Sequence, residues 1–234
     1  MLWRDYFHYV RPTLECMGLD VMAPRLKFGG TIIQRAADLC RQLADAEGPL
    51  HLIAHSMGGL DARHYITHMG GHEKVASLTT LSTPHRGSSA ANYVLGGKSL
   101  LKLLPSMRYL TPEAAKEFNE QTPDHPSVGY YSYTASRPLH ELPYISRRYG
   151  RHIHEWELSN DSQVSRISAI WGKRIGHLHA DHFEVVGMNL WLHPFRKRQR
   201  FDHLPTYREI GERILNIGTS NPIVTNLRDY DRSE

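Results

Sequence analysis

The stretch at residues 50–61, LHLIAHSMGGLD, constrains the fold of this chain more than any other. It begins with a short apolar run and passes through Ser56 into a pair of glycines, which is the pattern of a buried strand ending in a turn. Apolar residues then recur at helical spacing from Leu60 until Gly70 ends the pattern. The sequence therefore predicts a strand that enters a helix through a very tight turn, with Ser56 at its apex.

A turn of this kind strains the backbone of the residue at its apex and lifts the side chain above the edge of the sheet. The strain is tolerable only if the residues two before and two after the apex are small, and here they are Ala54 and Gly58. We therefore expect the Ser56 hydroxyl to lie at the sheet edge as a nucleophile. A serine in a glycine-rich turn can also be a turn residue alone, so the stretch leaves both interpretations open.

The 234 residues fit a single domain with a sizeable core, and 40% hydrophobic with 22% charged residues is ordinary for a globular protein. No apolar run approaches the roughly 20 residues that span a bilayer. The first residues, MLWRDYFHYVR, carry charges inside their apolar stretch. This pattern argues against a secretory signal and favours an intracellular protein.

The formal net charge of +4 and the pI of about 9.1 are a modest basic excess. No zinc-ligand spacing, aromatic RNA-binding signature or basic recognition helix accompanies this excess, so we expect no nucleic-acid partner. Cys16 and Cys40 both fall on apolar helical faces, which predicts buried free thiols rather than a disulfide.

Strand and helix patterns alternate along the chain, which predicts an α/β fold: a mostly parallel sheet with helices on both faces. We expect strands at residues 19–23, 50–54, 75–81 and 128–135, and helices at residues 3–17, 31–44, 60–69 and 206–218. Thr31 is the expected cap of the second helix, whose apolar face would carry Ile33. Thr206 and Glu209 form the expected capping box of the last helix.

Residues 89–127 change in character, because leucines crowd the first part and Thr111 then opens a short helix. We expect an insertion that forms a helical cap over the site. Such a cap could also move as a lid that opens onto lipid, or its leucines could simply pack over the sheet. Residues 136–152 are expected to be a loop, and residues 219–234 a loose tail.

The segment AHSMGG at residues 54–59 resembles the nucleophile elbow of the α/β-hydrolase lipases and esterases, including bacterial and fungal triacylglycerol lipases. It departs from the Gly-x-Ser-x-Gly pattern only at Ala54, which is also small. Three further segments are similar to motifs of that family, namely STPHRGS at 82–88, NDSQVS at 160–165 and ADHFEVVG at 180–187. The resemblance implies an α/β-hydrolase that cleaves carboxylic esters, with lipid esters as the expected substrates. Short-chain esterase, thioesterase and phospholipase activities are the alternatives among enzymes.

An isolated serine hydroxyl is a poor nucleophile, and it needs an imidazole to take its proton and a carboxylate to orient that imidazole. In the family these groups follow one another in the order serine, acid, histidine. The resemblance places the acid at Asp161, in a turn that follows an apolar strand-like run, and the histidine at His182. The expected catalytic residues are therefore Ser56, Asp161 and His182.

Alternatives to the acid and the base lie elsewhere in the chain. They are the carboxylates of Asp124 and Asp181 and the imidazoles of His177 and His179. Asp181 would be poorly aimed at the ring of His182, because the two residues are neighbours in sequence. His85 in the STPHRGS segment is expected to shape its own loop, since the family order places the working histidine last.

The backbone N–H of Met57, at the start of the elbow helix, is expected to donate to the oxyanion. In the family a second donor comes from a His-Gly loop upstream of the first helix, and no His-Gly pair precedes that helix here. We therefore expect a chain truncated at its N-terminus, or one that lacks its N-terminal strand or strands together with this loop. Loss of one donor costs about 10²- to 10³-fold in rate. A weakly active or non-catalytic protein that binds lipid or a partner is accordingly the alternative to an enzyme.

Some bacterial relatives bind calcium through an aspartate two residues after the catalytic histidine, where this chain has Glu184. Met188 stands at another ligand position, so we expect neither a metal nor a cofactor and interpret Glu184 as a structural or exposed carboxylate. Aromatic residues before the basic run at 196–200 predict a solvated loop or a peripheral contact with an anionic lipid surface. The expected partner is a lipid or other ester substrate, and no oligomeric state is predicted.

Overall fold

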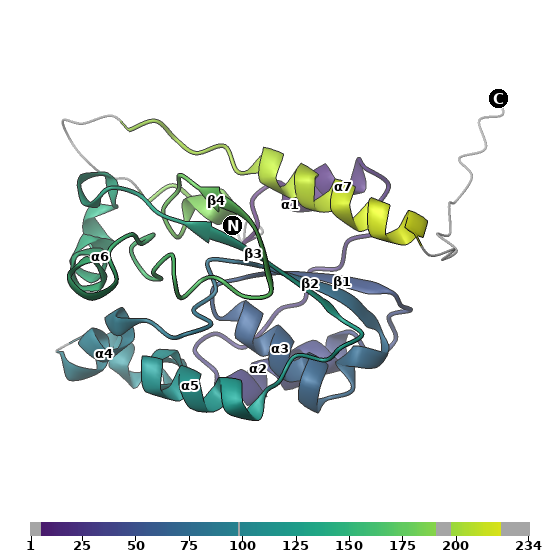
Figure 1. Ribbon diagram of the computed structural model, residues 1–234, viewed down its shortest axis with the longest axis horizontal. Helices are drawn as coiled ribbons and strands as arrows, with labels where there is room; N and C mark the ends of the chain where they lie inside the picture. Colours follow the sequence, from purple (N-terminus) through teal and green to yellow (C-terminus); the bar gives the residue numbers. More distant parts are fainter. Residues whose placement is uncertain (1–5, 98, 191–197, 221–234) are drawn as a thin grey trace, which may run out of the picture.

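The computed structural model describes residues 6–97, 99–190 and 198–220. Four parallel strands form one sheet in the order β1 (Leu50–His55), β2 (Val75–Leu81), β3 (Gly129–Ala135) and β4 (Lys173–Leu178). Figure 1 shows helices on both faces of this sheet, as the alternation of strand and helix patterns predicts. The α/β fold class and the strands at residues 75–81 and 128–135 are therefore confirmed.

The two faces of the sheet carry separate hydrophobic clusters, because successive residues of a strand point to opposite sides. Leu78 packs against α2 (Ile32–Gln42) and α3 (Gly58–His68), where Ala36 and Ile66 are fully buried. Leu81 on the other face packs against α1 (Val10–Glu15) and α7 (Leu204–Ser220), together with Tyr207. The sheet is thus the middle layer of a three-layer structure.

The second helix begins where the sequence predicts. The Thr31 hydroxyl accepts a hydrogen bond from the Gln34 N–H, and the Gln34 side chain accepts one from the Thr31 N–H, which completes a capping box. The buried face of α2 differs from the prediction, because Ile32, Ala36 and Leu39 are buried whereas Ile33 is exposed. Thr31 decides where the helix begins, but packing against α3 decides which stripe is covered.

The N-terminal region differs most from the prediction. Within the described residues, the helix expected at 3–17 extends only over Val10–Glu15, because Tyr9 adopts a left-handed backbone conformation at its start. Residues 19–23 form no strand, although their pattern favours one. A strand needs a neighbouring strand for its backbone hydrogen bonds, and this segment pairs with no described strand. Cys16 is exposed and Cys40 partly buried, so both are free thiols but neither is fully buried as predicted.

The insertion at residues 89–127 contains α4 (Ser89–Gly96), the 3-10 helices η2 (Leu100–Leu103) and η3 (Pro105–Leu110), and α5 (Pro112–Gln121). Thr111 caps α5 as expected, since its hydroxyl accepts a hydrogen bond from the Ala114 N–H at 3.2 Å. Leu100 and Leu103 are exposed, so these leucines do not pack over the sheet. A further short 3-10 helix, η1 (Gly71–Glu73), links α3 to β2.

The segment at 136–152, expected to be a loop, contains η4 (Leu139–Glu141) and most of α6 (Tyr144–Glu157). The prediction of a loop was wrong because α6 buries a face of mostly small residues, Ser146 and Gly150 beside Ile153. Such a face carries little hydrophobic periodicity. The apolar run before Asp161 is accordingly the end of a helix, not a strand.

The last described helix, α7, begins at Leu204, so Thr206 lies inside its first turn rather than at its cap. Asp202 accepts a hydrogen bond from the Leu204 N–H at 3.2 Å and takes the capping role instead. Most of the tail predicted at 219–234 lies outside the described residues, as do the aromatic residues before the basic run. None of the described helices combines the length and apolar character needed to cross a bilayer.

Candidate active site

Ser56 lies at the carboxyl end of β1, in the tight turn that leads into α3. Its φ of 54° is in the left-handed region, which a serine seldom adopts without support from its surroundings. The Ser56 N–H donates to the Leu81 carbonyl at 3.0 Å, and the Thr83 hydroxyl donates to the Ser56 carbonyl at 2.7 Å. The strand β2 and the loop after it therefore stabilise the strained turn.

In this turn Gly59, and not the expected Gly58, is the position that has no room for a side chain. A Cβ at Gly58 would meet only the Ala54 Cβ, at an ordinary 3.9 Å. A Cβ at Gly59 would lie 2.4 Å from the Thr83 Oγ1, which no rotamer of so short a side chain relieves. Close packing of α3 against the loop after β2 explains the second glycine of the pair.

His182 stands between Ser56 and Asp161. Its Nε2 lies 3.0 Å from the Ser56 Oγ, and its Nδ1 lies 2.9 Å from the Asp161 Oδ2. Both the imidazole and the carboxylate are almost fully buried. Because a carboxylate only accepts, Nδ1 carries the ring proton, and Nε2 is left to accept the hydrogen bond of the serine hydroxyl.

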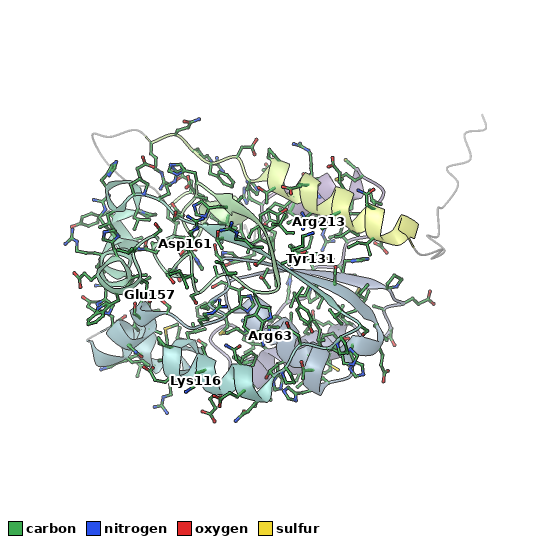
Figure 2. All side chains as sticks on the ribbon, viewed as in Figure 1. Arg63, Lys116, Tyr131, Glu157, Asp161 and Arg213 are labelled. Carbon is green, nitrogen blue, oxygen red and sulfur yellow. The ribbon has the colours of Figure 1, made fainter. Side chains whose placement is uncertain are left out.

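Asp161 is held in place by its own turn. Its Oδ1 accepts hydrogen bonds from the N–H groups of Gln163 and Val164, which leaves Oδ2 for the imidazole. The His182 N–H donates to the Asp161 carbonyl at 2.8 Å, so the loops after α6 and β4 are joined by backbone as well. Figure 2 shows Asp161 between α6 and the sheet, at the end where the strands finish.

The alternative residues make other contacts. The Asp181 carboxylate pairs with Arg198, and that of Asp124 accepts from the indole of Trp171. The ring of His177 is hydrogen-bonded to two hydroxyl groups, and that of His179 lies 3.3 Å from a carboxylate. None of these four side chains contacts Ser56 in the part of the chain that the structure describes.

His85 is completely buried, and its Nε2 lies 3.1 Å from the Thr80 hydroxyl. Its ring stacks on Trp171 at 5.1 Å between centroids. Burial and the charges of Arg63 and Arg86 lower the pKa of His85 well below its ordinary value, so the ring is neutral. His85 therefore supports the loop after β2, as the sequence predicts.

Sequence reasoning missed His55, the residue immediately before the nucleophile. Its ring centroid lies 4.5 Å from that of His182, and the Tyr6 hydroxyl lies 2.8 Å from its Nδ1. Burial and the charge of His182 lower the pKa of His55 well below its ordinary value. A neutral ring thus packs against the imidazole of His182. Adjacency to Ser56 is the one sequence signal that could have indicated this contact.

The Met57 N–H lies at the N-terminal end of α3, where the helix dipole favours negative charge. Among the described residues it donates to no acceptor. A backbone N–H that points from a helix terminus beside a serine hydroxyl is available to bind an oxyanion.

A buried ionic cluster holds the loop that carries His182. Arg137 contacts both oxygens of Glu184, at 2.8 and 3.3 Å, and Arg198 bridges Glu184 and Asp181 at 2.9 and 2.8 Å. The Asp181 Oδ1 in turn accepts the N–H groups of Phe183 and Glu184. Burial and the charge of Glu184 raise the pKa of Asp181.

This cluster shows the structural roles of Glu184 and Arg198, which the sequence left open. Glu184 is a buried structural carboxylate, and guanidinium groups occupy its surroundings. Arg198, from the run expected to be a solvated loop, is instead buried against two carboxylates. No group of three or more potential ligands for a metal ion is present among the described residues.

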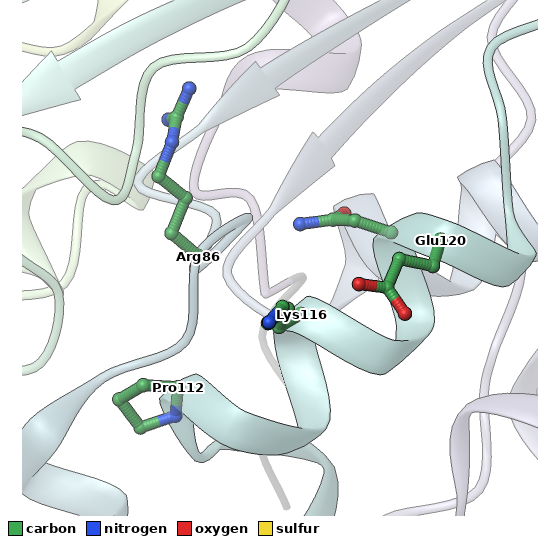
Figure 3. Close-up of a pocket in the computed structure, with 5 residues that line it drawn as sticks. Arg86, Pro112, Lys116 and Glu120 are labelled. Atoms are coloured by element: carbon green, nitrogen blue, oxygen red, sulfur yellow. The ribbon is translucent and has the colours of Figure 1, made fainter.

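A surface pocket of about 350 Å³ lies beside α5 (Figure 3). It is lined by Arg86, Pro112, Lys116, Asn119 and Glu120. Ser56, Asp161 and His182 do not line it, so the pocket is separate from the residues that the catalytic motifs predict.

A further buried carboxylate, outside the candidate site, gives the protein a predictable pH dependence. Asp61 on α3 is fully buried, and burial raises its pKa to about 7, although Arg35 at 2.8 Å opposes this shift. In the unfolded chain the Asp61 carboxylate binds a proton only below about pH 4. Because the folded state binds this proton more tightly, protonation of Asp61 stabilises the fold at low pH, and this stabilisation is lost as pH rises through about 7. We expect the free energy of unfolding from urea titrations to fall between about pH 5 and pH 8, and to fall less in Asp61→Asn. An equal fall in both proteins would contradict this prediction, and Asp20→Asn, which changes an exposed carboxylate, is the control.

The parallel sheet with helices on both faces has the α/β-hydrolase fold. Two solved structures with this architecture superpose on the chain. A metagenomic carboxyl esterase matches with a TM-score of 0.74 and 19% identity, covering 90% of this chain and 70% of the esterase. Lipase 1 from Pelosinus fermentans matches with a TM-score of 0.67 and 15% identity, covering 91% of this chain and 94% of the lipase. At these identities the likeness shows the fold.

Sequence comparisons point to the same class. A sequence model of the palmitoyl protein thioesterase family matches residues 16–131. Triacylglycerol lipase 2 of Saccharomyces cerevisiae is 34% identical over 209 residues, which cover 78% of this chain and 62% of the yeast protein. The chain thus spans about three fifths of the length of this relative. The chain therefore has the α/β-hydrolase fold, and its sequence is similar to a lipase and to the palmitoyl protein thioesterase family.

Proposed function

We propose that this chain hydrolyses carboxylic esters, with lipid esters as its substrates, through an acyl-enzyme on Ser56. The observation that carries the proposal is the continuous chain of hydrogen bonds from the Ser56 hydroxyl through both ring nitrogens of His182 to Asp161. This arrangement provides a nucleophile, a general base and a group that orients the base. The alternative of a non-catalytic binding protein offers no reason for so buried a polar chain.

In the first half of the reaction the Ser56 Oγ attacks the ester carbonyl carbon while His182 Nε2 takes the hydroxyl proton. The resulting oxyanion accepts a hydrogen bond from the Met57 N–H. As the bond to the leaving alcohol breaks, the imidazolium returns the proton to the alcohol oxygen. Asp161 stabilises the imidazolium and holds the ring in the required tautomer.

In the second half a water molecule attacks the acyl-enzyme carbonyl, and His182 Nε2 accepts a proton from that water. Collapse of the second tetrahedral intermediate breaks the bond to Ser56 and releases a carboxylic acid, while the proton returns to the serine oxygen. His55 remains neutral beside the imidazolium, which avoids repulsion between two positive rings.

Two of the comparisons support acyl substrates with long chains. The yeast relative is named a triacylglycerol lipase, and the matching family model is that of palmitoyl protein thioesterases. The same nucleophile and base can cleave an oxygen ester or a thioester, because both pass through an acyl-enzyme. Rates measured with p-nitrophenyl esters of increasing chain length and with palmitoyl thioesters distinguish lipase, short-chain esterase and thioesterase activity.

A fluorophosphonate probe tests the proposed nucleophile, since it reacts covalently with an activated serine. We expect labelling of the wild-type protein, loss of labelling in Ser56→Ala and a fall in ester hydrolysis of about 10⁶-fold in that variant. Ser82→Ala is the matched control, because Ser82 also has a positive φ and directly follows the neighbouring strand β2. A wild-type protein that neither reacts with the probe nor hydrolyses any ester would favour the binding protein instead.

A further inference from the structure

The helix α6 carries a row of apolar and aromatic side chains whose two ends are exposed and whose middle is half-buried. Ile145, Tyr149, His152 and Trp156 follow one another at intervals of four, three and four residues, which places them on one side of the helix. Ile145 is 68% exposed and Trp156 is 75% exposed. A large indole and a branched aliphatic side chain left in water on the same helix face indicate that this face contacts something apolar.

This row continues onto α4. The ring of Tyr93 lies 6.1 Å from that of Tyr149 and 5.0 Å from that of His152. The 3-10 helix η2 packs beside α4 and exposes leucines, with Leu100 at 80% and Leu103 at 70%. Figure 1 shows α4 and α6 together at one end of the molecule. We refer to these residues together as the α4–α6 surface: Tyr93, Leu100, Leu101, Leu103, Ile145, Tyr149, His152 and Trp156.

Positive charge accompanies the α4–α6 surface. Among the described residues of 89–110, Lys102 and Arg108 are exposed, and this range contains no aspartate or glutamate. On α6, Arg148, Arg151 and Glu155 are exposed beside the apolar row, so two positive charges accompany one negative charge there. Glu157 points toward α4 and accepts a hydrogen bond from the Ser89 N–H. An apolar face bordered by arginines is the pattern of a helix that lies in the interface of an anionic bilayer.

The α4–α6 surface is directly connected to the catalytic residues. α4 follows the loop whose Thr83 supports Ser56, and α6 ends a few residues before Asp161. The Asn160 side chain donates to the Gly150 carbonyl of α6 at 3.0 Å, which ties this helix to the acid turn. A membrane in contact with the α4–α6 surface would therefore lie at the end of the sheet where Ser56 is located.

We propose that the α4–α6 surface docks onto an anionic phospholipid bilayer, with Ile145 and Trp156 among the acyl chains and Arg148 and Arg151 at the anionic headgroups. The proposal rests on the proposed function, because the bilayer would supply the lipid ester. A second copy of the chain is a poor occupant, since a symmetric dimer through this surface would bring the arginines of both copies together.

Cosedimentation of the full chain with lipid vesicles tests the proposal. We expect partitioning onto vesicles of phosphatidylcholine with phosphatidylserine to exceed partitioning onto phosphatidylcholine alone by at least about tenfold, and to weaken as salt is added. The double variant Arg148→Gln/Arg151→Gln should bind the anionic vesicles roughly 25-fold more weakly. Arg208→Gln removes an exposed arginine from α7 on the other side of the sheet and should bind like the wild-type protein.

The apolar part of the contact needs its own variant. Ile145→Ser/Trp156→Ser should lower partitioning onto both kinds of vesicle, whereas Tyr9→Ser, which removes an exposed aromatic residue beside α1, should not. All four variants should hydrolyse a short soluble ester at the wild-type rate, because none changes a residue near Ser56. If the wild-type protein does not hydrolyse the soluble ester, the proposed function is refuted. The vesicle-binding measurement still tests the docking proposal by itself.

Three results would overturn the docking proposal. One is equal binding of the wild-type protein to both vesicle types, and another is undiminished binding by the double arginine variant. The third is a lipid-independent dimer, measured by sedimentation equilibrium, that Ile145→Ser/Trp156→Ser dissociates. That third result would assign the α4–α6 surface to contact between copies of the chain.

Discussion

Replacement of His182 by alanine is expected to lower kcat for ester hydrolysis by roughly 10⁶-fold, with little change in KM. The imidazole is the only proton acceptor within hydrogen-bonding distance of the Ser56 hydroxyl among the described residues, at 3.0 Å. Without it the hydroxyl must attack while it retains its proton, which makes it a poor nucleophile. Steady-state kinetics on a soluble p-nitrophenyl ester measure the effect.

The matched control for this substitution is His177→Ala. His177 is close in sequence, but its ring is hydrogen-bonded to the hydroxyl groups of Thr134 and Ser136. Its removal should leave kcat within a few-fold of the wild-type value. A His182→Ala protein that keeps a tenth of the wild-type activity, or a His177→Ala protein that loses as much as His182→Ala, would disprove the assignment of the base.

Replacement of Arg137 by methionine is expected to lower the free energy of unfolding by about 3–5 kcal/mol. Arg137 and Glu184 are both buried, and the guanidinium reaches both carboxylate oxygens. Its removal leaves a buried negative charge that Arg198 must neutralise together with that of Asp181. The midpoint of urea unfolding measures the loss. Since the cluster also holds the loop of His182, kcat should fall as well.

Two further variants separate the charge effect from simple loss of packing. The double variant Arg137→Met/Glu184→Met removes both charges and should recover much of the lost stability, because no unpaired carboxylate remains. Arg41→Met breaks an exposed pair with Asp38 on α2 and should cost at most about 1 kcal/mol. A double variant as unstable as the sum of its single substitutions would show that the ionic contact is not the source of the effect.

The residues of the candidate site were predicted from short local patterns in the sequence. Ser56 is indicated by small residues around a strand-to-helix turn, which any local steric argument can detect. Asp161 and His182 stand in segments that resemble family motifs in the expected order. The hydrogen-bonding geometry that joins them was not predictable, because Ser56 and His182 are 126 positions apart in the chain.

The parts that could not be predicted depend on neighbours far away in sequence. The pattern at residues 19–23 is typical of a strand, yet it has no partner strand among the described residues. The helix α6 was missed because its buried face is made of small residues that only tertiary packing covers. The ion pair of Arg137 with Glu184 joins residues 47 positions apart, and their spacing in the sequence does not indicate this contact.

By itself, the sequence determined the α/β class, the strand-to-helix turn at Ser56 and the identity of the acid and histidine motifs, because periodicity, small residues and short motifs act over a few positions. Only the tertiary structure decided that His55 packs against His182, that two arginines surround Glu184 and that α6 leaves Trp156 exposed. These features follow from the way parallel strands bring their carboxyl ends to one edge. There, side chains from distant segments meet, and burial and charge depend on which segments those are.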